Sequence, residues 1–304
     1  MSDTQHLTIT AGDAPADLAT GSIFFIGNAT VLLRYAGFTI LTDPTFIHMH
    51  EQTWLGYGMH TTRLVNPAID IDQLPPLDLI VLSHFHGDHF DQVVERDLDK
   101  RLPIVTCPDA AQELTDRGFG NTFALETWKS LTVTKGGASL QITATPARHG
   151  PAVVDLAMPE VMGSILEFRS GNEPARYRMY ITGDTLVYDD IKEIPRRYPD
   201  IDLALLHLGG TEVLGIMVTM DGKQGVEMLR IVDPTDAIPI HYNDYDVFKS
   251  PLSDFEDEVN SAGLAQRVHY LRHGDTFTFE GHDPRIDTPL NQGDTSMLSG
   301  EGHR

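Results

Sequence analysis

The stretch of sequence that decides the fold reads Leu79-Ile80-Val81-Leu82-Ser83-His84-Phe85-His86-Gly87-Asp88-His89-Phe90. Its apolar first part predicts a buried strand, and three histidines and one aspartate follow at the end of that strand. A neutral imidazole nitrogen and a carboxylate oxygen are both ligands that zinc and similar divalent ions accept. The H-x-H-x-D-H pattern therefore predicts a metal site at a strand end, in preference to a solvated histidine-rich turn.

The spacing of these donors suits two ions. His84 and His86 lie two residues apart, so in an extended backbone their side chains can converge on one ion from the same face. We expect Gly87 to turn the chain at positive φ and to aim Asp88 and His89 at a neighbouring point. Four donors cannot complete two coordination shells and leave room for water and substrate, so further ligands must come from elsewhere in the chain.

Three later runs with strand character also end in a candidate ligand. These ligands are His149, Asp184 and His241, and each stands at or just after the end of a run rich in apolar or β-branched residues. Taken alone, such a residue is more often part of a turn. Their recurrence at successive strand ends predicts that they belong to the same site.

In this order the motifs resemble those of the metallo-β-lactamase superfamily of binuclear metallohydrolases, and the resemblance runs from about Gly21 to about Gly274. It implies an α/β fold, a four-layer αββα sandwich of two mixed β-sheets flanked by helices. It also implies two ligand sets that share one bridging residue. The first ion would take His84, His86 and His149, the second would take Asp88, His89 and His241, and Asp184 would bridge the two.

Four further segments resemble one branch of that superfamily, which includes N-acyl-phosphatidylethanolamine-hydrolysing phospholipase D and L-ascorbate-6-phosphate lactonase. They are 27–30, 41–44, 74–78 and 202–206. The chain departs from this branch at Phe85 and Gly87, where phospholipase-like members tend to carry Asn and Tyr, and at His207, where Pro is common. These departures leave the ligands intact, but they prevent the substrate from being carried over.

The ligand set predicts an enzyme, a metal-dependent hydrolase. Two divalent ions about 3.5–4 Å apart can share a water and bring its pKa toward neutrality, which creates hydroxide without a strong protein base. We expect this metal-bridging hydroxide to cleave an ester-type bond, phosphodiester or lactone, in a small-molecule substrate. Zn²⁺ is the default ion for His and Asp ligands, and Mn²⁺ or Fe²⁺ accepts the same donors.

Two residues are assigned to catalysis. Asp88 could orient the hydroxide in addition to binding metal. His207 ends the predicted strand 203–206 at the same sheet edge as the ligands. We therefore expect it either to hydrogen-bond a metal ligand or to face the substrate, and the alternative is that it only caps the strand. The alternative function is an iron dioxygenase-like oxidoreductase on the same fold. His241 argues against it, because it completes a second set of metal ligands. A non-catalytic binding module is a third class.

Composition and charge set outer limits. The 304 residues, 41% of them hydrophobic, suit one large hydrolase domain over residues 21–280, with an N-terminal segment 1–20 and a polar tail 281–304. The formal charge of −22 would repel phosphate backbones, so a nucleic-acid partner is not expected. A single cysteine, Cys107, excludes a disulfide framework and a thiolate cluster. With no secretory signal and no apolar run of about 18 residues, the chain is expected to be cytoplasmic without a transmembrane segment. The oligomeric state is not predicted.

Strand, turn and cap signals predict most elements. Strands are expected over 22–26, 30–35, 38–41, 79–83 and 268–271, and hairpins over 131–144 and 163–181. Helices are expected from Asp91 to Asp97, between Pro108 and Gly118, from a cap at Asp221, and from Pro251 toward Gly263. Residues 43–72 show no clear period. They predict either a cover over the site or a structural loop packed on the sheet, with His48, His50 and His60 as polar loop residues rather than ligands.

Overall fold

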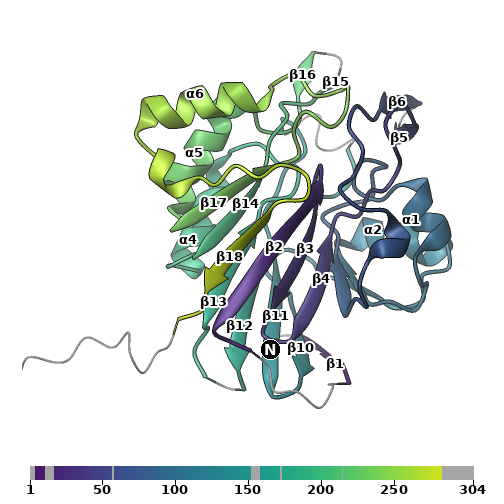
Figure 1. Ribbon diagram of the computed structural model, residues 1–304, viewed down its shortest axis with the longest axis vertical. Coiled ribbons are helices and arrows are strands. Elements are labelled where there is room, and N and C mark those ends of the chain that lie inside the picture. Colours follow the sequence, from purple (N-terminus) through teal and green to yellow (C-terminus); the bar gives the residue numbers. More distant parts are fainter. Residues whose placement is uncertain are drawn as a thin grey trace, which may run out of the picture.

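Two seven-stranded β-sheets pack face to face and carry helices on their outer faces (Figure 1). The computed structural model describes residues 4–10, 17–56, 58–151, 158–171, 173–213 and 215–282. Each sheet contains both parallel and antiparallel pairs, so the predicted four-layer αββα sandwich of two mixed sheets is confirmed.

The first sheet joins an antiparallel half to a parallel half. The pairs from β18 through β2 and β3 to β4 are antiparallel, and the pairs from β4 through β7 and β8 to β9 are parallel. In spatial order its strands are β18 (Thr276–Glu280), β2 (Thr20–Gly27), β3 (Thr30–Tyr35), β4 (Phe38–Thr42), β7 (Leu79–Val81), β8 (Ile104–Thr106) and β9 (Thr122–Ala124). Asn28 and Ala36, both with a φ of 53°, form the tight turns between its first strands.

The second sheet contains both predicted hairpins, in which Leu131 pairs with Ile142 and Leu166 pairs with Met179. Its strands, in spatial order, are β1 (Thr4–Thr8), β10 (Ser130–Lys135), β11 (Ala138–Thr145), β12 (Gly163–Ser170), β13 (Tyr177–Ile181), β14 (Leu203–His207) and β17 (Asp236–Ile240). The last three run parallel. β1 adds to the edge of β10, so part of the predicted N-terminal segment 1–20 belongs to the sheet. Of the predicted tail 281–304, residues from 283 onward lie outside the described part of the chain.

Helices cover the outer face of each sheet. α1 (Gln92–Asp97) and α2 (Pro108–Asp116) lie beside the first sheet, and α4 (Glu193–Arg197), α5 (Gly222–Val232) and α6 (Leu252–Ala262) lie beside the second (Figure 1). Three short 3₁₀ turns, η1 (Ile71–Gln73), η2 (Asp189–Lys192) and η3 (Ala265–Arg267), complete the helical elements of the described residues. The predicted ends are confirmed: the side chain of Asp91 accepts from Val93 and Val94 backbone N–H groups, Asp221 caps α5, and Gly263 ends α6 at a φ of 71°.

Two apolar clusters form the core. β14 shows how they are separated, because Leu203 and Leu205 face the cluster between the sheets while Ala204 and Leu206 face the cluster beneath α4, α5 and α6. All five residues of β14 are buried, as expected for a strand covered on both faces. The strands that carry the site residues are therefore held from both sides.

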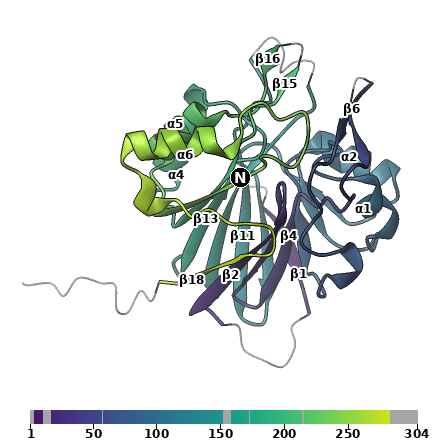
Figure 2. The same ribbon diagram turned by 45° about the horizontal axis from the view of Figure 1, so that its top comes forward.

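Two hairpins project from one end of the sandwich, which comes forward in Figure 2. They are β5 (Gln52–Gly56) with β6 (Met59–Thr62), and β15 (Glu212–Val213) with β16 (Ile216–Met217). The first hairpin lies inside the 43–72 segment, so the expectation of an irregular segment is wrong there. The predicted strand 268–271 is also wrong. Within this range only Val268 forms a β-bridge, with Ala237. The chain after it runs over the surface, where Tyr270 is 38% exposed.

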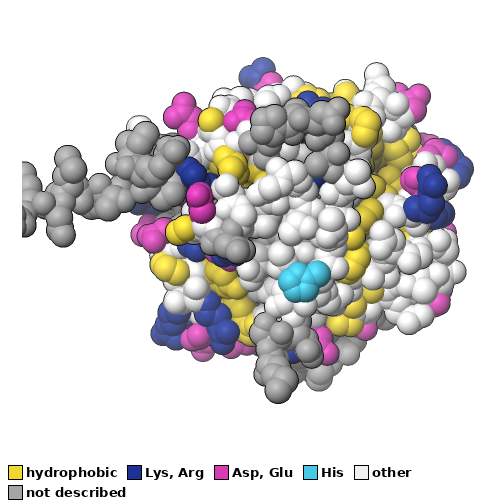
Figure 3. Space-filling view, turned by 90° about the horizontal axis from the view of Figure 1, so that it is seen from below, with side chains coloured by type: hydrophobic (Ala, Val, Ile, Leu, Met, Phe, Trp, Pro, Cys, Tyr) yellow, Lys and Arg dark blue, Asp and Glu magenta, His cyan; other side chains and the backbone are white. Residues whose placement is uncertain are grey.

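Figure 3 shows the end of the molecule opposite these hairpins. Acidic and basic side chains lie around its margin with both signs intermixed. Over the described residues this view therefore shows no broad basic surface of the kind that binds nucleic acid. No helix within the described ranges is both long enough and apolar enough to cross a membrane.

Candidate metal centre

The candidate ligands lie at one edge of the sandwich, where several strands end. β4 leads into Asp43, β7 into the loop 83–90, β13 into the turn before Asp184, and β17 into His241. Because the carboxyl ends of parallel strands meet at one edge of a sheet, residues far apart in the sequence come together there. His149 reaches the same edge from the loop that follows β11.

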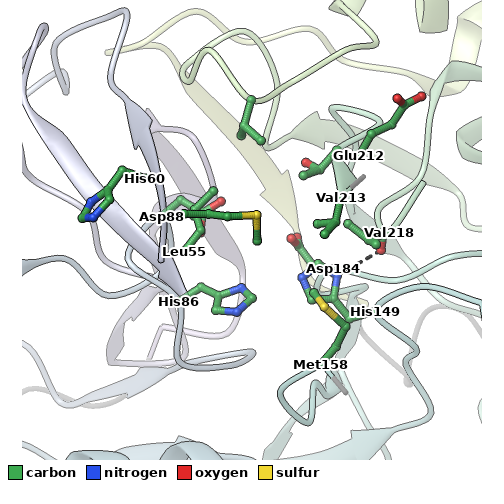
Figure 4. A pocket seen from close by; sticks show the side chains of 13 residues that line it. Leu55, His60, His86, Asp88, His149, Met158, Asp184, Glu212, Val213 and Val218 are labelled. Carbon is green, nitrogen blue, oxygen red and sulfur yellow. Dashed lines mark hydrogen bonds between the residues drawn. The ribbon is translucent and has the colours of Figure 1, made fainter. Parts of the chain in front are cut away.

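His84, His86 and His149 form a first donor group, in which one ring nitrogen of each lies within 4.8 Å of the others. His84 Nε2 and His86 Nδ1 are 3.0 Å apart, close to the roughly 3.3 Å expected between two nitrogens of a tetrahedral zinc site. His149 Nδ1 donates to the carbonyl oxygen of Val218 at 3.0 Å, the dashed line in Figure 4. That bond leaves His149 Nε2 to face the group.

Asp88, His89, Asp184 and His241 form a second donor group, whose ligand atoms also lie within 4.8 Å of one another. His89 Nε2 is 3.1 Å from His241 Nε2 and 3.4 Å from Asp184 Oδ2. His241 Nε2 is 3.5 Å from Asp88 Oδ2, and its Nδ1 donates to the carbonyl oxygen of Leu208 at 3.0 Å. The seven predicted ligands thus lie in two neighbouring groups, and Asp184, which was predicted to bridge two ions, lies in the second group.

The two groups differ in charge. In the first group burial lowers the pKa of His84 and His149 and lowers that of His86 to about 3, so the rings are neutral and keep a lone pair. In the second group burial alone would lower the pKa of His89 and His241. The neighbouring carboxylates of Asp184 and Asp88 outweigh burial and raise both pKa values. A cation bound in this group would take the place of any proton on these ring nitrogens, because a histidine ligand must be neutral.

Unpaired atoms support the fit to metal. His86 Nε2, Asp88 Oδ1 and Asp184 Oδ1 are buried and have no hydrogen-bond partner among the described residues. Leaving such groups unpaired costs on the order of 1–3 kcal/mol each. Five imidazoles and two carboxylates, some of whose atoms have no hydrogen-bond partner, are the donor chemistry that divalent ions such as zinc accept.

Gly87 has a different role from the one expected. Its φ does not lie in the left-handed region. A Cβ atom at this position would instead lie 2.1 Å from Thr53 Oγ1 and 2.5 Å from the carbonyl oxygen of Trp54. Gly87 therefore allows the β5–β6 hairpin to pack against the loop that carries the first ligands, and the Gly87 N–H donates to the Trp54 carbonyl oxygen at 2.9 Å.

Asp43 lies behind the second donor group and connects it to His207. One Asp43 oxygen accepts from the Ser83 N–H at 2.7 Å and lies 3.5 Å from His89 Nδ1. The other lies 3.3 Å from His207 Nε2. Burial would raise the pKa of Asp43, but hydrogen bonds from His207 and His89 bring it below the usual value. Asp43 stands at a strand end in the segment 41–44, which was the signal that could have singled it out.

His207 is fully buried and stacks on His89, with ring centroids 5.9 Å apart. Its Nδ1 lies 3.2 Å from Thr182 Oγ1, and it is not among the residues that line the cavity. This geometry favours one of the alternatives predicted for His207: it contacts Asp43, which contacts the candidate ligand His89, and it does not face the substrate. Asp43, His89 and His207 are themselves close enough to hold an ion, but Asp43 already contacts both histidines, at 3.3 Å from His207 Nε2 and 3.5 Å from His89 Nδ1.

A cavity of about 230 Å³ opens onto both donor groups. Figure 4 shows His86 and Asp88 on one side of it and His149 and Asp184 on the other. The described residues that line it are Leu55, Met59, His60, His86, Asp88, His149, Met158, Asp184, Thr211, Glu212, Val213, Val218 and Val247. The β5–β6 hairpin supplies three of them, so part of the 43–72 segment covers the site, which is one of the two predicted alternatives.

The other histidines of that segment lie apart from the donor groups. His48 is exposed and pairs with Asp70 at 2.7 Å, and His50 is exposed. The side chain of His60 points away from Asp88 in Figure 4. Within the described part of the chain, none of the three belongs to a group that could hold a metal ion.

Comparison with known proteins agrees with the geometry. A family described as "Beta-lactamase superfamily domain" matches residues 39–242. A "UPF0173 metal-dependent hydrolase" of Rubrobacter xylanophilus is 26% identical over 259 residues, covering 83% of this chain and 94% of its own. Another from Ignicoccus hospitalis is 29% identical over 263 residues, covering 86% and 100%. The crystal structure of an isothiocyanate hydrolase from Delia radicum gut bacteria superposes with a TM-score of 0.71 at 20% identity, covering 85% of this chain and 99% of that one.

The family match spans well over half of the chain and includes each of the seven candidate ligands. The superposition shows the same fold over most of the length of both proteins. This chain therefore belongs to the metallo-β-lactamase superfamily of enzymes.

Proposed function

We propose that the protein is a metal-dependent hydrolase with a binuclear centre, and that it cleaves an ester-type bond, phosphodiester or lactone, in a small molecule. The observation that carries the proposal is the pair of donor groups on the floor of one cavity. The names of its curated relatives, which are metal-dependent hydrolases, support the same class of reaction.

The chain's own residues divide the work. His84, His86 and His149 would hold one ion, Asp88, His89 and His241 the other, and Asp184 both. Divalent ions held there would lower the pKa of a water toward neutrality and polarise the substrate oxygen. Asp88 lines the cavity with an unpaired oxygen, so its carboxylate can also accept a hydrogen bond from the attacking water and orient it.

The His89–Asp43–His207 contacts hold one ring of the second group in place. The hydrogen bonds from His149 and His241 to backbone carbonyls do the same for two further rings. We propose zinc as the resident ion, with manganese or iron as ions that the same donors accept. The second donor group also favours a hydrolase over the iron dioxygenase alternative, because His241 brings its number of donors to four and so completes a second metal site.

The test combines metal analysis with single-residue variants. Protein purified without added metal is expected to carry about two ions per chain. His149→Ala and His241→Ala should each lose one ion and lower kcat/KM by on the order of a hundredfold or more. The matched control is His48→Ala, an exposed histidine that should keep both ions and full activity.

The substrate panel consists of phosphodiesters, lactones and β-lactams. Turnover of a phosphodiester or lactone by the two-ion protein supports the proposal. Full activity with one ion per chain contradicts the binuclear centre, and two bound ions with no turnover of either class contradict the reaction.

A further inference from the structure

The walls of the cavity above the donor groups are mostly apolar. Their apolar residues are Leu55, Met59, Met158, Val213, Val218 and Val247, which outnumber the polar lining residues His60, Thr211 and Glu212. The cavity volume of about 230 Å³ exceeds the roughly 150 Å³ of an apolar cavity that binds benzene. It therefore suits a small molecule with an apolar part of several carbon atoms, whose burial against these walls would be favourable.

The lining also lacks a cationic side chain: none of its described residues is Lys or Arg. Arg148 is next to His149 in the sequence, but its guanidinium lies 4.0 Å from the centre of the Tyr188 ring and lines a separate surface hollow. Arg63 is fully buried and binds Thr45 and Asp244. Among the residues that the structure does not describe, the sequence has Lys or Arg only at Arg285 and Arg304, in the segment 283–304.

Among the described lining residues, an anionic substrate would therefore meet no cationic side chain outside the donor groups. Enzymes that transfer phosphoryl groups commonly add Arg or Lys to their metal ions, because charge accumulates on several oxygens in the transition state. Among the described lining residues, the one Asp, Glu, Lys or Arg outside the donor groups is Glu212, whose carboxylate points outward in Figure 4. A negative charge at the mouth, on a chain of net charge −22, disfavours anions further.

One polar group in the wall has no partner. The hydroxyl of Thr211 is buried and makes no hydrogen bond among the described residues, although the Thr211 carbonyl oxygen accepts from the Val218 N–H at 2.8 Å. Thr211 is 8% exposed and lines the cavity. A buried hydroxyl without a partner costs about 1–3 kcal/mol, and an oxygen of a bound molecule would relieve that cost.

We propose that the substrate is a small uncharged carboxylic ester or lactone, and that Thr211 positions it by donating to an oxygen of the ester group. This inference rests on the proposed hydrolase function and narrows it. Water adds to the acyl carbon and forms a new C–O bond, the bond from that carbon to the alkoxy oxygen breaks, and the leaving oxygen takes a proton. The products are a carboxylic acid and an alcohol, which in a lactone stay in one molecule.

The first experiment compares substrates that share one leaving group. The metal-loaded enzyme is assayed with para-nitrophenyl butyrate, the para-nitrophenyl half-ester of succinate, and bis-para-nitrophenyl phosphate. We expect kcat/KM for the uncharged butyrate to exceed that for each anionic compound by roughly tenfold or more, the equivalent of one unfavourable charge contact. A phosphodiester that is turned over faster than the butyrate overturns the substrate class but leaves the hydrolase standing. No turnover of any of the three by protein with two ions counts against the hydrolase itself.

The second experiment tests Thr211. Thr211→Val keeps the shape of the side chain and should raise KM for the butyrate, lowering kcat/KM roughly tenfold with little change in kcat. Thr211→Ser should restore most of the loss. The control is Thr106→Val, since Thr106 is another buried threonine but lies on β8 outside the cavity. An unchanged KM in Thr211→Val, with unchanged metal content, would overturn the role of Thr211.

The third experiment adds the missing charge. Val213→Lys places an ammonium group in the wall and should raise kcat/KM for the succinate half-ester relative to the butyrate by about tenfold. Val213→Met, which adds length without charge, is the matched control. If the lysine leaves the ratio between the two substrates unchanged, the wall does not set the charge preference.

Discussion

At the scale of single residues, unusual backbone conformations are found at the site. Asp43 has a φ of 34° and His241 a φ of 61°, values that residues with a Cβ atom rarely adopt. Such conformations cost on the order of 1–3 kcal/mol and persist where the surrounding structure holds them. The His241 N–H donates to the Asn28 carbonyl oxygen at 2.8 Å, and the Asn28 amide donates to the Asp88 carbonyl oxygen at 2.6 Å. These bonds hold His241 in its unusual conformation and connect it to Asp88.

Asp43→Asn tests the support behind the second donor group. The substitution keeps the shape of the side chain but removes the charge that faces His89 and His207. We expect the affinity for the second ion to fall roughly 10- to 100-fold, as for other residues that orient metal-binding histidines. Competition with a chromogenic chelator measures this affinity. Asp70→Asn, at an exposed acid that pairs with His48, is the control, and equal affinities in the two variants would show that Asp43 does not orient His89.

At the scale of elements, the β5–β6 hairpin is fixed to the loop that carries the first ligands. The Gln92 amide of α1 donates to the Gln52 carbonyl oxygen at 2.9 Å, and Thr53 Oγ1 donates to Gln92 Oε1 at 3.2 Å. Together with the close approach at Gly87, these bonds connect α1, the hairpin and the metal-binding loop. The hairpin wall of the cavity is thus positioned by the same segment that supplies His86 and Asp88.

Gly87→Ala should break this arrangement. A methyl group would collide with Thr53 and Trp54, and overpacking of this kind costs typically about 1–3 kcal/mol. We expect a lower melting temperature and a lower kcat/KM, because the hairpin must move away from the cavity. Gly120→Ala is the matched control, since a Cβ there meets nothing within 4 Å. Identical melting temperatures for the two variants would refute the tight packing.

The sequence predicted those elements that carry local signals. Helix caps such as Asp91 and Asp221 depend on a few neighbouring residues, and so do the turns of the two long hairpins. The β5–β6 hairpin was not predicted because its strands are short and because an apolar residue, Trp54, is 48% exposed and so interrupts the apolar pattern.

The role of Gly87 was not predicted for a different reason. It depends on a hairpin about thirty residues earlier in the chain, and no local pattern reports such a contact.

The candidate ligands were predictable for the same kind of reason. Each stands at the end of a strand, and their order along the chain matches a family pattern. Asp43 shares that position, but its partner His207 comes from the other sheet, and a contact between sheets has no signature in the sequence. The cavity walls, Thr211 among them, likewise became visible only when segments from both sheets were brought together.

At the scale of the whole molecule, a buried charge network joins distant segments. Arg63, after β6, lies 3.4 Å from Asp244, and Asp244 lies 3.1 Å from His273, just before β18. His273 Nδ1 also donates to the Asn66 carbonyl oxygen at 3.0 Å. Burial would lower the pKa of His273, but the hydrogen bond and charge of Asp244 raise it above the usual value.

This network predicts a pH dependence of stability. A histidine with a raised pKa in the folded state stabilises the fold fully below its unfolded value of about 6.5, and that contribution disappears as the pH rises through the folded pKa. His273→Gln should therefore destabilise the protein more at about pH 6 than at about pH 9. Urea unfolding of metal-loaded wild type and variant at both values measures the difference. The same loss of stability at both pH values would contradict the charged pairing with Asp244.

The placement of the donors on both sheets has a mechanical consequence. His84 to His89 extend from the first sheet, while Asp184 and His241 extend from the second. An ion bound in the second group would act as a cross-link between the two layers, closing a loop that runs from residue 89 to residue 241. Cross-links across long loops remove much of the freedom of the unfolded chain. Losing that ion would therefore remove a link between the two sheets at the edge that forms the cavity, although the apolar cluster between the sheets would still hold them together.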